Sequence, residues 1–148
     1  MKKVYLFLIA ILVFILSVNA GEDLRFFNAL KSCTPYSSNG VINTAEIKAG
    51  YNSKILGWEG NKCVYKREVK FSGIDACVIC KFTQTHLDRL VGVMKAYGDI
   101  EELVGNNLDL SDTEALKTNP VVKVWTEYLQ DSSVCSISVD TESGAIGY

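Results

Sequence analysis

The side chains of this chain with the greatest scope for chemistry are five cysteines and one histidine. Two of the cysteines form the run Cys77-Val-Ile-Cys80, whose spacing is that of thiol–disulfide oxidoreductases. An exported protein with an odd number of cysteines has one thiol that stays free, bonds to another molecule or reacts. The position of each cysteine on its element therefore decides which chemistry is open to it.

The Cys77–Cys80 pair is predicted to lie on a strand. A redox-active pair needs a helix N-terminus, where the helix dipole lowers the thiol pKa and the turn brings both sulfurs together. Val78 and Ile79 are β-branched and favour a strand, on which residues three apart project to opposite faces. The helix pattern begins only at Thr83. We therefore favour structural cysteines, and catalysis by Cys77 and Cys80 is the alternative.

Alternation along neighbouring strands indicates which cysteines form disulfides. Across a simple hairpin, Cys63 and Cys80 face the same side, and Cys77 faces away. Cys77 is therefore the candidate for a free or intermolecular thiol. The predicted strand 134–140 places Cys135 on the core side, and Cys33 lies at the end of the predicted helix 22–32. The predicted bridged set is Cys33, Cys63, Cys80 and Cys135, and the pattern leaves the pairing within this set open.

His86 is the only histidine, so a Ser-His-Asp, Cys-His or multi-histidine zinc site would have to include it. Its place six residues after Cys80 suggests a Cys-Cys-His metal site. Structural zinc sites close with four ligands, and exported thiols are usually oxidised before a metal reaches them. We therefore expect no metal and no cofactor, and we predict that His86 borders the core.

Four aromatic residues are candidates for the floor of a ligand groove, because large rings provide apolar contact area. Their strand and helix spacing is more typical of core residues. They are Trp58, Tyr65, Trp125 and Tyr128.

Residues 1–20 are predicted to be a signal peptide. Lys2 and Lys3 precede an apolar run of 15 residues, and cleavage is expected after Ala20. That run is shorter than the roughly 20 residues of a membrane-spanning helix. The expected mature chain, residues 21–148, is a single domain without a stable membrane span, located in the periplasm or outside the cell.

The mature residues predict a disulfide-stabilised α+β domain, with an antiparallel sheet of about three to five strands and helices packed on one face. The expected helices cover residues 22–32, 83–98 and 112–118, with a further helix that begins at Asn119-Pro120. Residues 36–43 are expected to be a loop, 59–62 a hairpin turn, and 41–48 ambiguous. The expected strands cover residues 55–58, 63–71, 74–82 and 134–140, with one more edge strand possible after Thr141.

These features favour a non-enzymatic, exported binding or interaction module. Its expected partner is another exported or surface protein, and a dimer through Cys77 is possible. Acidic residues exceed basic ones, 17 against 15, which argues against nucleic-acid binding. The alternative function is that of a thiol–disulfide oxidoreductase that uses Cys77 and Cys80.

Overall fold

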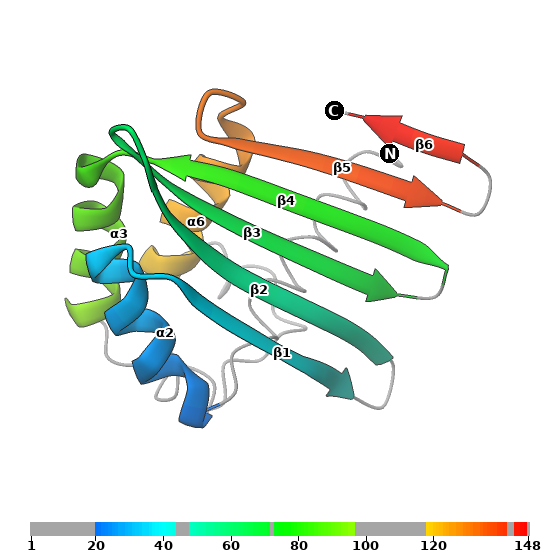
Figure 1. Cartoon of the computed structure of the whole chain (residues 1–148), viewed down its shortest axis with the longest axis horizontal. Coiled ribbons are helices and arrows are strands. Elements are labelled where there is room, and N and C mark those ends of the chain that lie inside the picture. Colours follow the sequence, from blue (N-terminus) through cyan, green and yellow to red (C-terminus); the bar gives the residue numbers. More distant parts are fainter. Residues whose placement is uncertain (1–19, 44–47, 72, 97–117, 142–143, 148) are drawn as a thin grey trace.

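Six antiparallel strands, each hydrogen-bonded to the next along the chain, form the framework of the protein in a computed structural model (Figure 1). The structure describes residues 20–43, 48–71, 73–96, 118–141 and 144–147. The helices are α2 (Ala20–Ser32), α3 (Gln84–Ala96) and α6 (Pro120–Gln130). The strands are β1 (Tyr36–Asn43), β2 (Lys48–Glu59), β3 (Lys62–Phe71), β4 (Ile74–Phe82), β5 (Cys135–Thr141) and β6 (Gly144–Gly147).

The core lies between one face of this sheet and the three described helices. Figure 1 shows the helices gathered at the end of the sheet where β2 turns into β3, with α6 behind β3 and β4. Residues of a strand that are two apart share a face, so Cys63 and Tyr65 of β3 point toward the helices together. The helical members of the core are Ala29, Leu30, Leu87, Leu90, Met94, Val121, Val124, Trp125, Tyr128 and Leu129.

The predicted α+β class, an antiparallel sheet with helices on one face, is confirmed. The bounds predicted for the strand 74–82 are those of β4, and the predicted turn 59–62 joins β2 to β3. The sheet has one strand more than the upper end of the predicted range, because β6 pairs with β5 from Thr141↔Gly144 onward. The sequence had marked this tail as a possible edge strand.

The loop predicted for residues 36–43 is wrong, because these residues form β1. The register runs from Tyr36↔Ile55 to Asn43↔Lys48, so β2 is also longer than the predicted strand 55–58. The run is polar and contains Gly40, which weakens its intrinsic preference for a strand. Pairing with β2 supplies the backbone hydrogen bonds, and this tertiary contact outweighs the local preference.

Several predicted features lie outside the described residues. They are the signal peptide up to residue 19, the end of the predicted helix at Gly98 and the helix 112–118 up to residue 117. Among the described residues, no helix is both long and apolar enough to cross a membrane.

Two glycines allow the tight connections of the β2–β3–β4 meander. Gly60 and Gly73 have φ angles of +59° and +76°, in the left-handed region that glycine enters without a steric penalty. Each lies in a two-residue connection, between Glu59 and Lys62 or between Phe71 and Ile74. These short connections set the register that places Cys80 opposite Tyr65.

Helix α6 begins as the sequence predicts, with Asn119 as cap and Pro120 as the first helical residue. The Asn119 side-chain oxygen accepts hydrogen bonds from the backbone N–H groups of Val121 (3.0 Å) and Val122 (3.3 Å). Two N–H groups that would otherwise lack a helical partner are thereby satisfied.

Replacement of Asn119 by Ala should lower the free energy of unfolding by about 1 kcal/mol, because both bonds are lost. Asn119→Ser, which retains an acceptor suited to this position, is the control and should recover most of the difference. Urea denaturation followed by circular dichroism measures both changes. Equal stabilities for the Ala and Ser variants would contradict the assigned cap.

Candidate functional site

The Cys77–Cys80 pair lies within β4, and its two side chains point to opposite faces of the sheet. Cys80 is opposite Tyr65 and faces the helices, where it is fully buried. Cys77 is opposite Glu68 on β3 and Ser138 on β5, on the face away from the helices. Helix α3 begins at Gln84, beyond the pair. The structure therefore lacks the two adjacent thiols at a helix start that the oxidoreductase alternative requires.

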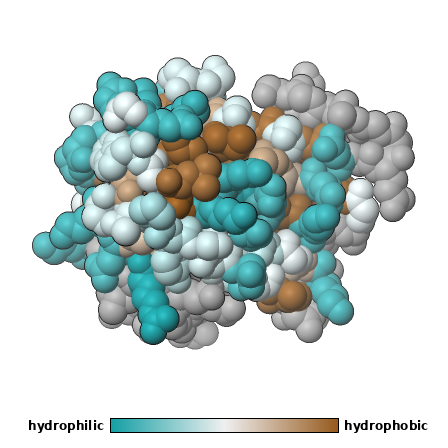
Figure 2. Space-filling model, viewed as in Figure 1, coloured by the Kyte–Doolittle hydropathy of each residue, from teal (hydrophilic) through white to brown (hydrophobic). Residues whose placement is uncertain are grey.

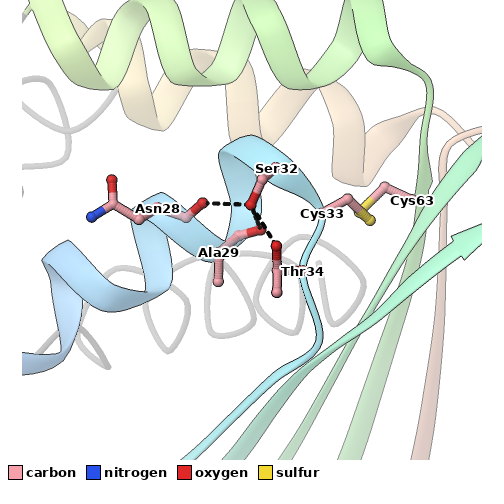
Figure 3. The surroundings of a disulfide bond; sticks show 6 residues. All are labelled: Asn28, Ala29, Ser32, Cys33, Thr34 and Cys63. Atoms are coloured by element: carbon pink, nitrogen blue, oxygen red, sulfur yellow. Dashed lines mark hydrogen bonds between the residues drawn. A yellow bond between two sulfur atoms is a disulfide. The ribbon is translucent and has the colours of Figure 1, made fainter.

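The other four cysteines form two disulfides within the helical face of the sheet. Cys33, directly after α2, is bonded to Cys63 near the start of β3 (Figure 3). Cys80 is bonded to Cys135, the residue directly opposite it on β5. One bridge fixes a helix to the sheet, and the other joins two strands. By restricting the unfolded chain, each stabilises the fold by about 2–4 kcal/mol.

The end of α2 presents Cys33 to its partner through a Schellman-type turn. The N–H of Thr34 donates to the carbonyl of Ala29 (2.9 Å), and the N–H of Cys33 donates to that of Leu30 (3.1 Å). Cys33 has a φ of +50°, at the position where glycine is usual. The Ser32 hydroxyl donates to the carbonyl of Asn28 (3.0 Å), as Figure 3 shows. The backbone carbonyls at the end of α2 thus accept local hydrogen bonds, and the residue that follows the helix, Cys33, forms the disulfide.

Cys77 is the only free cysteine of the five, all of which lie in the described part of the chain. Burial raises the pKa of its thiol above the ordinary value, and nearby Lys66 opposes this effect. Reactive cysteines have a lowered pKa, because the thiolate is the attacking species. Burial therefore favours the protonated thiol form of Cys77, and its side chain is half-buried.

A small apolar patch lies on the same face of the sheet, over β3 and β4. Figure 2 shows it as brown side chains over β3 and β4, bordered by hydrophilic residues. Ile79 and Val64 share the face, since they are opposite Lys66 and Lys81 in the register. Lys66 forms an ion pair with Glu68 at 2.8 Å beside the patch. Its charged border makes this face typical of a solvated sheet surface.

His86 occupies a structural position in the first turn of α3. Its backbone N–H donates to the hydroxyl oxygen of Thr83 (3.2 Å), and its Nδ1 accepts from the N–H of Thr83 (3.1 Å). This is the reciprocal arrangement of a capping box, with histidine in the place of the usual Glu or Gln. Within the described residues, no group of three or more His, Cys, Asp or Glu side chains is placed to hold a metal ion.

Three of the four candidate groove aromatics belong to the core. Tyr65, Trp125 and Tyr128 are buried there, and each ring contacts Phe82 of β4 at a centroid distance of 5.6–6.4 Å. The structure therefore does not bring the four aromatics together as the floor of a groove. Trp58 lies elsewhere, at the end of the β2–β3 hairpin, and 44% of its surface is exposed.

Trp58 and Leu56, which lie on either side of Gly57, are the exposed large apolar residues near the end of that hairpin, and we call this end the hairpin tip. Leu56 is 55% exposed and lies at a β-bulge, where the register shifts between Ile55 and Gly57. Gly57 has a φ of +101°, a conformation that other residues rarely adopt. The sequence prediction did not include Leu56, although an isolated glycine within a strand pattern is a recognised signal of a bulge.

The hairpin tip is held in place from several sides. Trp58 is directly opposite Cys63, which is bonded to Cys33. Glu59 forms an ion pair with Lys81 of β4 at 3.4 Å. Both ionic groups are exposed, so the disulfide is the stronger constraint.

Comparisons of the chain with protein-family models, with curated proteins and with solved structures yield no match. The geometry of the described residues is therefore the basis for any functional assignment.

Alkylation of the folded protein without reductant should label one thiol per chain, at Cys77, and full reduction in denaturant should expose all five. The rate of labelling should rise with pH along a curve displaced above that of a free cysteine, because burial raises the thiol pKa. Intact-mass measurement and peptide mapping provide the count. A thiol that titrates below the ordinary value would contradict the assigned environment.

Joint replacement of Cys80 and Cys135 by Ala should lower the free energy of unfolding by about 2–4 kcal/mol. Cys77→Ala is the matched control from the same strand, and its effect should be much smaller because no bridge is lost. Denaturant unfolding without reductant measures all three proteins. Similar losses for the control and the double variant would show that the bridge does not stabilise the fold.

Proposed function

We propose that the protein is an exported, non-catalytic interaction module that binds another exported or surface protein through its hairpin tip. The observation that carries the proposal is the exposure of two large apolar side chains, Trp58 and Leu56, on either side of Gly57 near the end of one hairpin. Tryptophan is largely buried in most proteins, and it is enriched among the residues that dominate binding energy at protein interfaces.

Rigidity of the hairpin tip supports a binding role. Cys63, opposite Trp58, is fully buried and is disulfide-bonded to the end of α2. A surface that is ordered before binding loses less conformational entropy when the partner docks. The tryptophan ring can therefore contribute its apolar area at a small entropic cost.

Export is supported by two independent features of the chain. Residues 1–20 have the basic start, apolar run and small-residue end of a signal peptide. The two disulfides are of a kind that forms and persists in oxidising compartments such as the periplasm and the extracellular space. A partner that meets the hairpin tip would belong to the same compartment.

Site-specific photo-crosslinking tests this function in the cells that produce the protein. A photoreactive phenylalanine analogue at position 58 should give one discrete adduct with a second protein. The same analogue at Lys123, which is exposed on α6, is the matched control and should not give that adduct. Adducts of equal yield at both positions, or none at position 58, would contradict binding through the hairpin tip.

A second variant separates binding from folding. Leu56→Asp places a charge in the proposed contact and should reduce the yield of the position-58 adduct by about tenfold, the size expected for a residue central to an interface. The side chain is exposed, so the free energy of unfolding should change little. Urea denaturation of the variant verifies that the fold is retained.

A further inference from the structure

The start of α3 is held by a pair of hydrogen bonds that requires neutral histidine. Nδ1 of His86 accepts the backbone N–H of Thr83 at 3.1 Å, so this nitrogen carries no proton. The usual capping residues at this position, Glu and Gln, accept a hydrogen bond at neutral pH without titrating near it. Histidine has an ordinary pKa near 6.5, so this cap changes state within the range of mildly acidic environments.

His86 also joins α3 to α6. The Tyr128 hydroxyl donates to the backbone carbonyl of His86 at 3.0 Å, and the two rings meet edge-on with centroids 5.1 Å apart. Beside them, Arg89 of α3 pairs with Glu127 of α6 at 2.6 Å. His86 therefore takes part both in the hydrogen bonds of the first turn of α3 and in the contact of that turn with α6.

We propose that His86 is an acid-sensitive latch, whose protonation releases the first turn of α3 and loosens the contact of that turn with Tyr128. A proton on Nδ1 turns the acceptor into a donor that faces the N–H of Thr83. The two donors repel each other, and the N–H of Thr83 loses its partner. The ring then has to rotate away from the position that it holds against α6.

The groups around His86 favour its neutral form at neutral pH. Burial lowers the pKa of His86 below the ordinary value, and the positive charges of Lys62 on β3 and Arg89 on α3 act in the same direction. Asp131, after the end of α6, opposes them. Tyr128, the ring against His86, is neutral in this range, and burial raises its pKa further above the ordinary value.

The direction of the pH effect follows from the lowered pKa. In the unfolded chain His86 titrates near 6.5, and in the folded protein it titrates at a lower pH. The contribution of the latch to the free energy of unfolding is therefore complete above about pH 6.5. It decreases as the pH falls and is lost below the pKa of His86 in the folded protein.

The decisive experiment compares the wild-type protein with His86→Gln in denaturant unfolding between pH 7.5 and pH 4.5. Gln accepts the same bond at every pH in this range. The wild-type unfolding constant divided by that of the variant should be constant above pH 7. It should rise roughly fivefold at the acidic end, because only the wild type loses the bond there. A ratio that is independent of pH would overturn the proposal.

A measurement on the wild type alone keeps the proposal testable if the variant does not fold. Because His86 is the only histidine, its ring protons can be followed by NMR without ambiguity. The amide proton of Thr83 should shift with the same midpoint as the ring, and that midpoint should lie below 6.5. A midpoint at or above 6.5, or a Thr83 amide that does not follow the ring, would overturn the latch.

Discussion

The alternation of side chains along the central strands β3 and β4 is the constraint on which the rest of the structure depends. Because successive residues of a strand point to opposite faces, Tyr65, Cys80 and Phe82 are all directed toward the helices. Trp125 contacts both Tyr65 and Phe82, with ring centroids 5.9 and 5.8 Å away. The same alternation directs Cys77 to the opposite face. The packing of the core and the separation of the two neighbouring cysteines therefore have one cause.

The disulfides strengthen this arrangement at the points where it needs support. The Cys33–Cys63 bridge attaches α2 beside the hairpin tip, and the Cys80–Cys135 bridge joins β4 to β5. Both lie on the helical face, whereas the free cysteine, Cys77, lies on the opposite face, where burial raises the pKa of its thiol.

Features that depend on neighbouring residues in the chain were predictable from the sequence. The bounds of β4, the turn around Gly60 and the cap at Asn119 follow from local preferences that agree with the final fold. β1 was not predictable in this way. Its polar residues have little intrinsic preference for a strand, and only pairing with β2 makes them one.

The residues of the candidate site likewise fall into those whose placement the sequence predicts and those whose placement it does not. Strand periodicity alone places Cys77 and Cys80 on opposite faces, because the period of two is a property of the extended backbone. The sequence did not separate Trp58 from Trp125, since burial depends on which other elements cover each ring. Nor did it assign His86 to the cap of α3, which requires the ring nitrogen to meet the N–H of Thr83 in space. The sequence by itself therefore determined the helices α2, α3 and α6, the strands β3 to β5 and the opposite faces of Cys77 and Cys80, which are set by local backbone geometry. Only the tertiary structure decided the disulfide pairing, the exposed hairpin tip and the role of the histidine, because each depends on contacts between segments distant along the chain or on the orientation of a side chain.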